Sequence, residues 1–463
     1  MASLVRVLHT TIAFCFCATV ALTPFPLGSN RDWAWSPLGV VTGMLLLMHV
    51  VYLLVSGRPS VMTWSALGFP TVALGVVLLW SVVQTLELPY LSMPNPILES
   101  AGKVLGGGSR VRITLDDERT RTAIMRLMSY CGIFLLSAEL AKDRAFCRRL
   151  CATVIGSAVV VTLYGWVMQV TAQSCVAWTY IKRPIEDGPC SFSGTFINSD
   201  NYATYVGLAT LVCLAQLHAL LLDNNARTGP ARERWRIYLM TMSGKGSLLL
   251  GALLILLGGA IYSGSKAGLV SLVFAAIIMN TTLNFLQRGS RATIVWSAIS
   301  ILVLMAFVLA IGGETVISRA IAFLSEGDRD RVALYSMTLN GIALRPWTGW
   351  GLGTFASAYS ILQPPQLEPF YDKAHNVYLE ILMTLGIPCA CLFFAALAFI
   401  VMRCLKGMAL RSRDSHYPAL GFGATMLVGL HSSVDFGVQI PAVAVLYTTL
   451  LGLGWSQSWV SKR

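Results

Sequence analysis

The 463-residue chain is 55% hydrophobic and only 12% charged, with a mean hydropathy of +0.66, which excludes an ordinary soluble domain. Its repeated apolar runs of about 18 or more residues are long enough to cross a hydrocarbon core of roughly 30 Å. Because these runs are continuous rather than alternating, they exclude a β-barrel and predict an all-α polytopic membrane protein.

Twelve apolar segments are predicted to be transmembrane helices, forming one transmembrane domain over residues 1–463. The first segment follows Arg6 and resembles a signal peptide, but it lacks a persuasive small-x-small cleavage site. We therefore expect it to remain as the first helix. The predicted spans run near 8–24, 37–56, 63–84, 122–140, 150–172, 200–222, 247–263, 266–285, 292–312, 376–402, 417–434 and 440–459.

The distribution of lysine and arginine predicts the orientation. With the N-terminus inside, the cytoplasmic segments carry 19 of the 34 basic residues but only five of the 22 acidic ones, as the positive-inside rule requires. Both termini are then cytoplasmic. The formal net charge of +12 reflects this topology, so no nucleic-acid partner is expected.

Three outer loops are long enough to carry function, namely 85–121, 173–199 and 313–375. The last lies between predicted helices nine and ten, is expected to be partly helical, and is the predicted location of the active site. Cys175 and Cys190 share one loop; whether they form a disulfide the sequence leaves open. No cysteine and histidine spacing is typical of a metal site, and no metal or cofactor is expected.

His375 is the candidate base. It lies beside Lys373 and Asn376, two further candidates for substrate binding, where the long polar loop meets predicted span ten. A neutral imidazole there can accept a proton from a hydroxyl nucleophile near neutral pH. The alternative is an interfacial helix cap in which His375 or Asn376 satisfies free backbone N–H groups.

His431 and Asp435 form a second candidate group because a spacing of four places both on one helical face. A carboxylate that orients an imidazole is a familiar catalytic arrangement. Polar groups near a membrane-embedded helix end equally serve to join helices, and we favour this structural interpretation.

Cations form the other half of the predicted site. Arg329, Arg331, Arg345 and Lys373 belong to the long loop, and Lys266 begins a span directly after a Ser-Gly-Ser turn. An arginine fork suits phosphate oxygens, and a helix N-terminus preceded by Gly and Ser is a natural anion site. The alternatives are anchoring to lipid headgroups and a simple short turn. The glycines of GWGLGTF are weak indicators of phosphate binding, since no strand precedes them.

Several stretches together resemble the bacterial O-antigen ligase and polymerase superfamily of membrane glycosyltransferases. They occur in family order over roughly residues 110–450. These stretches are ITLDDERTRTAIMRLMSYCGIFLLSAELA, SGTFINSDNYATYVGL, YSGSKAG, RVALYSMTLNGIALRPWTGWGLGTF, AHNVYLEILMTLGIP and HSSVDFGVQIP.

The resemblance implies a metal-independent transferase that takes a glycan from undecaprenyl pyrophosphate at the periplasmic face. A ligase would join it to lipid A core, and a polymerase to another lipid-linked glycan. Carried over, the base falls on His375 and one pyrophosphate-binding arginine on Arg331. The chain departs from the family pattern at Lys266, where arginine is usual, and at Asn198-Ser199-Asp200, where the pattern is N-R-N. It departs a third time at Val377, two residues after the histidine, where an acidic or polar residue is frequent.

The expected reaction is a direct displacement that inverts the anomeric centre, with cations stabilising the leaving pyrophosphate. The expected function is O-antigen ligation in lipopolysaccharide or exopolysaccharide assembly, with membrane lipids as further partners. Two alternatives are kept, a repeat-unit polymerase of the same superfamily and a polysaccharide transporter or flippase. Transporters commonly show related halves and midplane binding sites; no matching half-repeat is visible here, which favours the enzyme.

Overall fold

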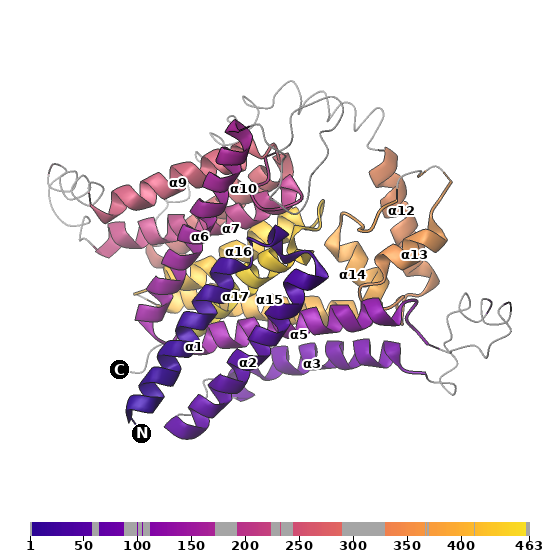
Figure 1. Cartoon of the computed structure of the whole chain (residues 1–463), viewed down its shortest axis with the longest axis horizontal. Helices are drawn as coiled ribbons and strands as arrows, with labels where there is room; N and C mark the ends of the chain where they lie inside the picture. The colour runs from indigo at the N-terminus through magenta and orange to yellow at the C-terminus, as the bar shows by residue number, and fades with distance from the viewer. Residues whose placement is uncertain are drawn as a thin grey trace.

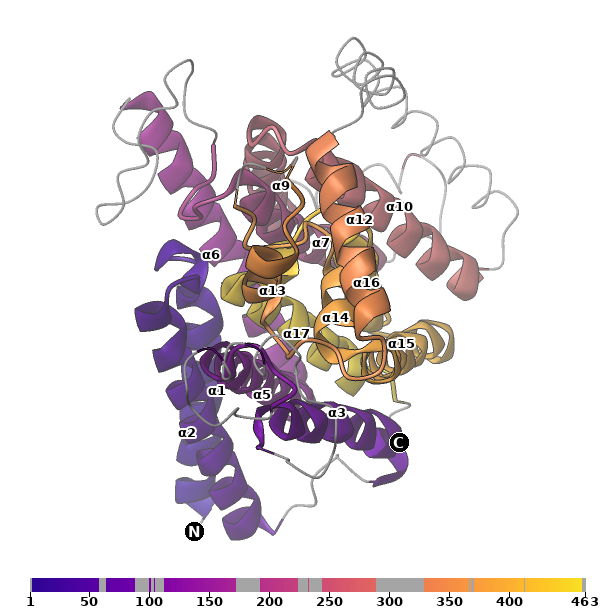
Figure 2. The same cartoon turned by 90° about the vertical axis from the view of Figure 1, so that its right-hand side faces the viewer.

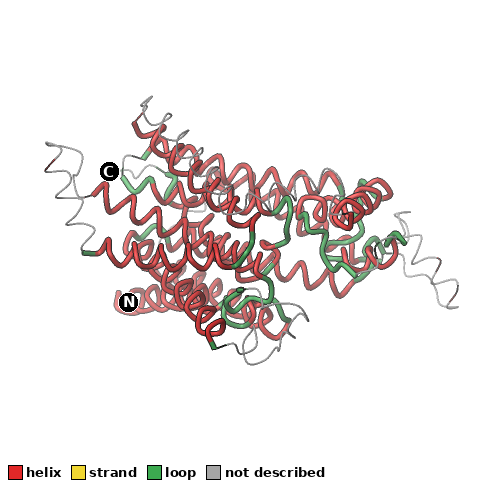
Figure 3. Tube along the Cα trace, turned by 90° about the horizontal axis from the view of Figure 1, so that it is seen from above, coloured by secondary structure: helices red, strands yellow, loops and turns green. Residues whose placement is uncertain are grey.

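The computed structural model describes residues 2–57, 64–87, 100, 104, 112–171, 192–223, 232, 244–288, 329–365, 367, 370–411 and 413–459. Within these ranges all regular structure is helical, which confirms the predicted all-α fold class (Figures 1 and 3). Loop 173–199 is described only from residue 192, so Cys175 and Cys190 lie outside the described residues, as do most of loop 85–121 and residues 313–328.

Eleven of the twelve predicted spans coincide with described helices, and the ninth, 292–312, lies outside the described ranges. Among the helices that the structure describes, eight are long and apolar enough to cross a membrane, and α9 and α17 are shorter apolar helices, which supports a multi-pass membrane protein. The longer elements are α1 (Ala2–Leu22), α2 (Asp32–Ser56), α3 (Trp64–Thr85), α5 (Asp117–Leu140), α6 (Arg144–Val170), α7 (Ser199–Asp223), α9 (Lys245–Tyr262), α10 (Lys266–Arg288), α12 (Arg329–Leu344), α15 (Ile387–Leu410), α16 (His416–His431) and α17 (Pro441–Ser456). The short ones are η1 (Leu27–Ser29), α13 (Phe355–Leu362), α14 (Val377–Leu385) and η2 (Gly437–Gln439).

The prediction of a single span over 376–402 is wrong in one respect, because the chain breaks there into α14 and α15. Gly386 separates the two helices with a φ of 80° and a ψ of 157°, outside the helical region. The N–H of Ile387 leaves the helical pattern and donates to the carbonyl of Pro346, 2.7 Å away. The apolar periodicity runs through the break, but Gly386 and Pro388, which lies in the first turn of α15, mark a helix end and a helix start that the span prediction passed over.

A small second core lies at one end of the molecule, where α12, α13 and α14 pack together (Figures 1 and 2). Leu334, Met337, Phe355, Tyr359 and Met383 are buried in it. These buried apolar side chains explain why the mostly polar stretch after residue 329 folds. It is a helical cap with its own apolar core, in contact with the end of the bundle through α14 and α15.

Gln84, near the end of α3, fastens the GWGLG segment to the break after α14. Its side-chain amide donates to the carbonyls of Thr348 (2.8 Å) and Thr384 (3.0 Å), and its oxygen accepts from the N–H of Leu352 (3.0 Å). Gly349 has a φ of 66°, and a Cβ at this position would overlap the carbonyl of Thr384. The glycines therefore permit close backbone approach here, which is a packing role.

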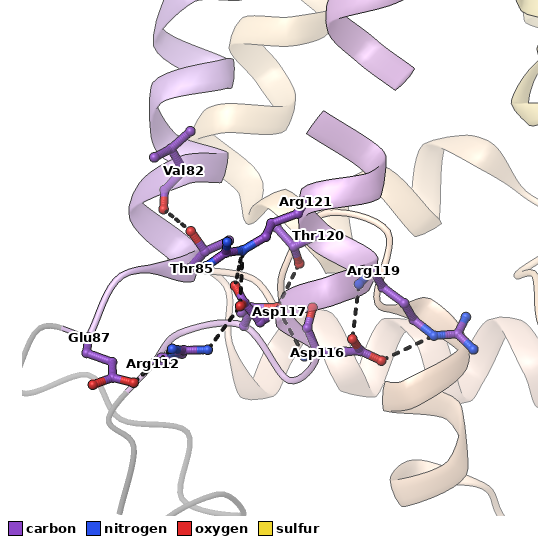
Figure 4. Close-up of polar contacts among 10 residues, drawn as sticks. Val82, Thr85, Glu87, Arg112, Asp116, Asp117, Arg119, Thr120 and Arg121 are labelled. Atoms are coloured by element: carbon purple, nitrogen blue, oxygen red, sulfur yellow. Dashed lines mark hydrogen bonds and ion pairs between the residues drawn. The ribbon is translucent and has the colours of Figure 1, made fainter. Parts of the chain in front are cut away.

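The segment before α5 is held by ion pairs, shown in Figure 4. Arg112 bridges Glu87 (2.8 Å) and Asp117 (3.2 Å), while Arg121 pairs with Asp117 at 3.1 Å. Asp116 is the N-cap of α5 and accepts a hydrogen bond from the N–H of Arg119 (3.0 Å). Capping and acidic residues at the first turn thus start this helix, as its DDER sequence favours.

Replacing Gly386 with alanine is expected to destabilise the protein by on the order of 1–3 kcal/mol, because a non-glycine residue is strained at this positive φ. The added Cβ would also overlap the carbonyl oxygen of Trp347. The apparent melting temperature of the detergent-solubilised protein measures the effect. Gly156→Ala is the matched control, since a Cβ there meets nothing within 4 Å. Equal melting temperatures for the two variants would contradict the role of Gly386.

Candidate functional site

His375 and Asp435 meet at the junction of α14 and α16. The Nδ1 atom of His375 lies 3.6 Å from Oδ1 of Asp435. The histidine side chain is 24% exposed, whereas the aspartate side chain is only 5% exposed. The carboxylate lies on the Nδ1 side of the ring, so Nε2 is the ring nitrogen on the opposite side from Asp435. The pair therefore presents a base whose Nε2 is directed away from its acidic partner.

Two hydrogen bonds bring these residues together. The N–H of Val377 donates to the carbonyl of Ser432 (2.9 Å), and the side-chain amide of Asn376 donates to the carbonyl of Ser433 (3.0 Å). Asn376 also caps α14, since its Oδ1 accepts from the N–H of Leu379 (3.1 Å). Asn376, predicted as a substrate-binding residue, thus has both ends of its amide engaged in positioning the start of α14.

The backbone of His375 is held in an unusual conformation. Its φ is +49°, the left-handed region that a non-glycine residue rarely adopts. The hydroxyl of Tyr335 on α12 donates to the His375 carbonyl (3.0 Å), and the rings of Phe436 and Tyr371 lie edge-on to the imidazole at 5.0 and 6.1 Å. Surroundings that fix such a strained residue are typical of functional sites.

His431 has a different partner from the one predicted for it. Its Nδ1 lies 2.7 Å from the hydroxyl of Thr204 on α7, while the carboxylate of Asp435 is directed at His375. The backbone N–H of Asp435 donates to the carbonyl of His431 (3.0 Å). His431 is buried and joins α16 to α7, in agreement with the interpretation as a link between helices.

The Ser-Gly-Ser turn before Lys266 is tied to the same region. The hydroxyl of Ser265 donates to Oδ1 of Asp200 (2.5 Å) and accepts from the N–H of Gly268 (3.2 Å), so it both tethers and caps α10. Lys266 is the exposed first residue of that helix. Asn198 accepts from the N–H of Asp200 (2.7 Å) directly before the first residue of α7.

Asp200 belongs to the Asn198-Ser199-Asp200 stretch, which has an acidic residue and no cation where the family pattern is N-R-N. The structure gives it a definite partner, because it anchors the turn that carries Lys266. Its carbonyl also accepts from the hydroxyl of Thr204 (3.0 Å), the residue bonded to His431. A continuous set of polar contacts therefore runs from the Lys266 turn through α7 to the end of α16.

The cations of the long loop differ in their surroundings. Arg331 is exposed on the first turn of α12, and Arg329 begins that helix. Arg345 belongs to the scaffold: its Nη1 donates to the carbonyl of Ile113 (3.0 Å), its guanidinium lies 5.6 Å from the Trp350 ring, and burial lowers its pKa. Lys373 lies 3.7 Å from the buried carboxylate of Glu380, whose other oxygen accepts from the N–H of Ala374 (3.1 Å).

Sequence reasoning missed four residues of this site: Tyr335, Thr204, Ser265 and Glu380. Glu380 carried a usable signal, because an acid inside a predicted apolar span is a functional-site hypothesis by default. Asp200 and Thr204 carried a weaker one, a spacing of four that places them on one face of α7. Nothing in the sequence pairs Tyr335 with the carbonyl of His375.

A comparison with known families adds to this geometry. A family model described as O-antigen ligase matches residues 251–394 of the chain. This matched segment, which covers less than half of the chain, is similar to the O-antigen ligase family. The matched O-antigen ligase segment includes Lys266, Arg331 and His375, while Asp200, His431 and Asp435 lie outside it. No curated protein matches the chain.

Removing the side-chain amide of Asn376 is expected to weaken the packing that positions His375. Asn376→Ala should lower stability by roughly 1 kcal/mol for the lost cap, plus the loss of the bond to Ser433. Asn376→Ser keeps a capping oxygen but cannot donate to that carbonyl, so its melting temperature should lie between those of the wild type and the alanine variant. If the serine variant matched the alanine variant, the capping role assigned to Asn376 would be refuted.

Proposed function

We propose that this protein transfers a glycan from undecaprenyl pyrophosphate to a sugar hydroxyl at the periplasmic face of the inner membrane. The observation that carries the proposal is the contact between His375 and the buried Asp435, at the start of α14 and inside the matched O-antigen ligase segment for His375. This pair has the components of a general base with an orienting carboxylate. The proposed transfer requires one hydroxyl proton to be removed.

In the proposed reaction the Nε2 atom of His375 takes the proton of the acceptor hydroxyl. The hydroxyl oxygen forms a bond to the anomeric carbon as the bond from that carbon to the phosphate oxygen breaks, and the electron pair leaves on the lipid pyrophosphate. Asp435 then faces a protonated imidazole at 3.6 Å and stabilises its charge. A single displacement of this kind inverts the anomeric centre, and no metal ion takes part.

The leaving group carries most of the developing charge. Cations that meet pyrophosphate oxygens at a preorganised site are often the largest catalytic contribution. We assign this role to Arg331 and Lys266, with Arg329 and Lys373 as further candidates. The tether from Asp200 to Ser265 supports the assignment of Lys266, because it fixes the helix N-terminus that carries the lysine.

The description of the matched family favours a ligase, with lipid A core or another glycan as acceptor, over a polymerase. A strain that lacks the gene distinguishes the two. Lipid-linked polymer that accumulates without attachment indicates a ligase, whereas single repeats attached normally to the acceptor indicate a polymerase. Loss of a transporter would also leave the donor unattached, but at the cytoplasmic face, so the side of the membrane on which the lipid-linked glycan accumulates separates a transporter from a ligase.

Replacing His375 with alanine is expected to lower kcat by about 10²- to 10⁴-fold, the usual contribution of a general base. Asp435→Asn should lower kcat by less and leave KM for the acceptor almost unchanged, because Asp435 acts through His375. Transfer by the purified protein from a synthetic lipid-linked donor measures both, and NMR of the product reads its anomeric configuration. His9→Ala, at the other end of the bundle, is the control. Unchanged kcat in His375→Ala, or retention of configuration, would refute the mechanism.

Replacing Lys266 or Arg331 with alanine should weaken binding of the lipid-linked donor about tenfold each, as expected for one lost charge-assisted hydrogen bond. Lys266→Arg should retain tight binding, since it keeps the charge and adds a fork. Lys406→Ala, an exposed lysine near the end of α15, is the control. Donor affinity equal to that of the wild type in both alanine variants would remove these residues from the pyrophosphate site.

A further inference from the structure

The backbone on the two sides of the His375 side chain is held by side chains from two different helices. Before it, the N–H of Ala374 donates to Oε2 of Glu380 on α14 (3.1 Å). After it, the hydroxyl of Tyr335 on α12 donates to the carbonyl of His375 itself (3.0 Å). His375 has a φ of +49°, and a non-glycine residue stays in this region only where its surroundings enforce it. These two bonds therefore bear directly on where the imidazole lies.

Glu380 is a buried acid in an otherwise apolar helix. Only 6% of its side chain is exposed, and Nζ of Lys373 lies 3.7 Å from its Oε1. A buried carboxylate is costly unless it is both paired and hydrogen-bonded, and the contacts with Lys373 and Ala374 meet these two needs. Glu380 thus binds the chain at the two residues that precede His375.

Two interpretations of Glu380 are possible from its place in the first turn of α14. An acid there interacts favourably with the positive end of the helix dipole, so it could simply stabilise the helix. That interpretation does not account for Tyr335, which comes from a different helix and bonds to the backbone of the same short segment. The convergence of both side chains on the backbone around His375 favours a role in positioning the base.

Tyr335 connects this backbone to the helical cap. It lies on α12 one turn after Arg331, so both residues occupy one side of that helix. Helix α12 also packs on α14 (Figure 2). The cation proposed to meet the pyrophosphate and the hydroxyl that holds the His375 carbonyl are therefore parts of one rigid element.

We propose that Glu380 and Tyr335 are positioning residues for the transfer, which together hold the backbone of His375 so that its imidazole faces the acceptor hydroxyl. The proposal rests on the proposed function, in which His375 is the base. Asp435 contacts the ring of His375 at Nδ1, whereas Glu380 and Tyr335 act on the backbone. The orientation of the ring and the position of the backbone are thus controlled by separate residues.

Each of the two bonds can be removed with little change in shape. Tyr335→Phe removes only the hydroxyl. Tyr205→Phe is its matched control, since it removes a hydroxyl that lies 3.3 Å from the hydroxyl of Ser157, between α6 and α7. Glu380→Leu removes the acceptor for Ala374, whereas Glu380→Gln keeps an accepting oxygen and removes only the charge.

Transfer by the purified full-length protein is measured with the synthetic lipid-linked donor over a range of acceptor concentrations. We expect Tyr335→Phe and Glu380→Leu to lower kcat by about 10- to 100-fold, the effect of a small misplacement of a reacting group. The KM values for donor and acceptor should stay almost unchanged, because both residues act through the base. Glu380→Gln should retain most of kcat, and Tyr205→Phe should match the wild type.

The position of His375 is also measured without transfer, by the rate at which diethyl pyrocarbonate modifies its imidazole, followed by mass spectrometry. Tyr335→Phe and Glu380→Leu should raise this rate by about 3- to 10-fold, as expected when one ordering hydrogen bond is lost. Glu380→Gln and Tyr205→Phe should leave the rate unchanged. A variant with a general loss of stability would instead show a lowered melting temperature and a faster reaction at the other histidines as well.

Wild-type kcat in either Tyr335→Phe or Glu380→Leu would overturn the proposal. So would a kcat in Glu380→Gln as low as in Glu380→Leu, because the charge and not the bond to Ala374 would then matter. A rise in KM at unchanged kcat, or an unchanged modification rate, would also contradict a positioning role. The proposed function fails separately: wild-type kcat in His375→Ala would remove the base, while the modification rates would still report whether Glu380 and Tyr335 hold its backbone.

Discussion

The attachment of α14 to the end of α16 is the constraint on which the site depends. Two hydrogen bonds, from Val377 and Asn376 to consecutive carbonyls at Ser432 and Ser433, bring the loop before α14 against the turn after α16. Together with the hydrogen bond from the Tyr378 hydroxyl to the carbonyl of Gly429 (2.7 Å), they place His375 beside Asp435, which are sixty residues apart in the chain. Since the break at Gly386 allows α14 to follow its own direction, α15 can still cross the bundle.

Gln84 and the glycines of the GWGLG segment also hold α14 in place, at its C-terminal end. Gln84 on α3 binds the carbonyl of Thr384, and Gly349 lets the GWGLG backbone approach the same residue closely. Arg345 continues this scaffold to the segment before α5. The glycine-rich GWGLG segment in the middle of the long loop thus has a packing role. The residues proposed to take part in the reaction, Arg331 and His375, lie toward the two ends of the loop.

Composition and periodicity were sufficient for the fold class and for eleven helix positions, because apolar length is a local property. The break at Gly386 had a local signal in Gly386 and Pro388, whereas the carbonyl of Pro346, which accepts from Ile387, could not be foreseen because it is distant in the chain. His375 could be selected from its place at a helix start, but its partner could not. The spacing of four suggested that Asp435 faces His431, and the tertiary contact with His375 overrides this local geometry.

A cavity of about 1310 Å³ shares a wall with the pair formed by His375 and Asp435. Lys373 and Val377 line it on either side of His375 in sequence, and Ser432 and Val438 do so around Asp435. Asp200 fixes a second part of the site, because its carboxylate accepts from Ser265 and so holds the turn from which Lys266 extends. Thr204 connects the two parts, since its hydroxyl donates to the Asp200 carbonyl and lies 2.7 Å from Nδ1 of His431.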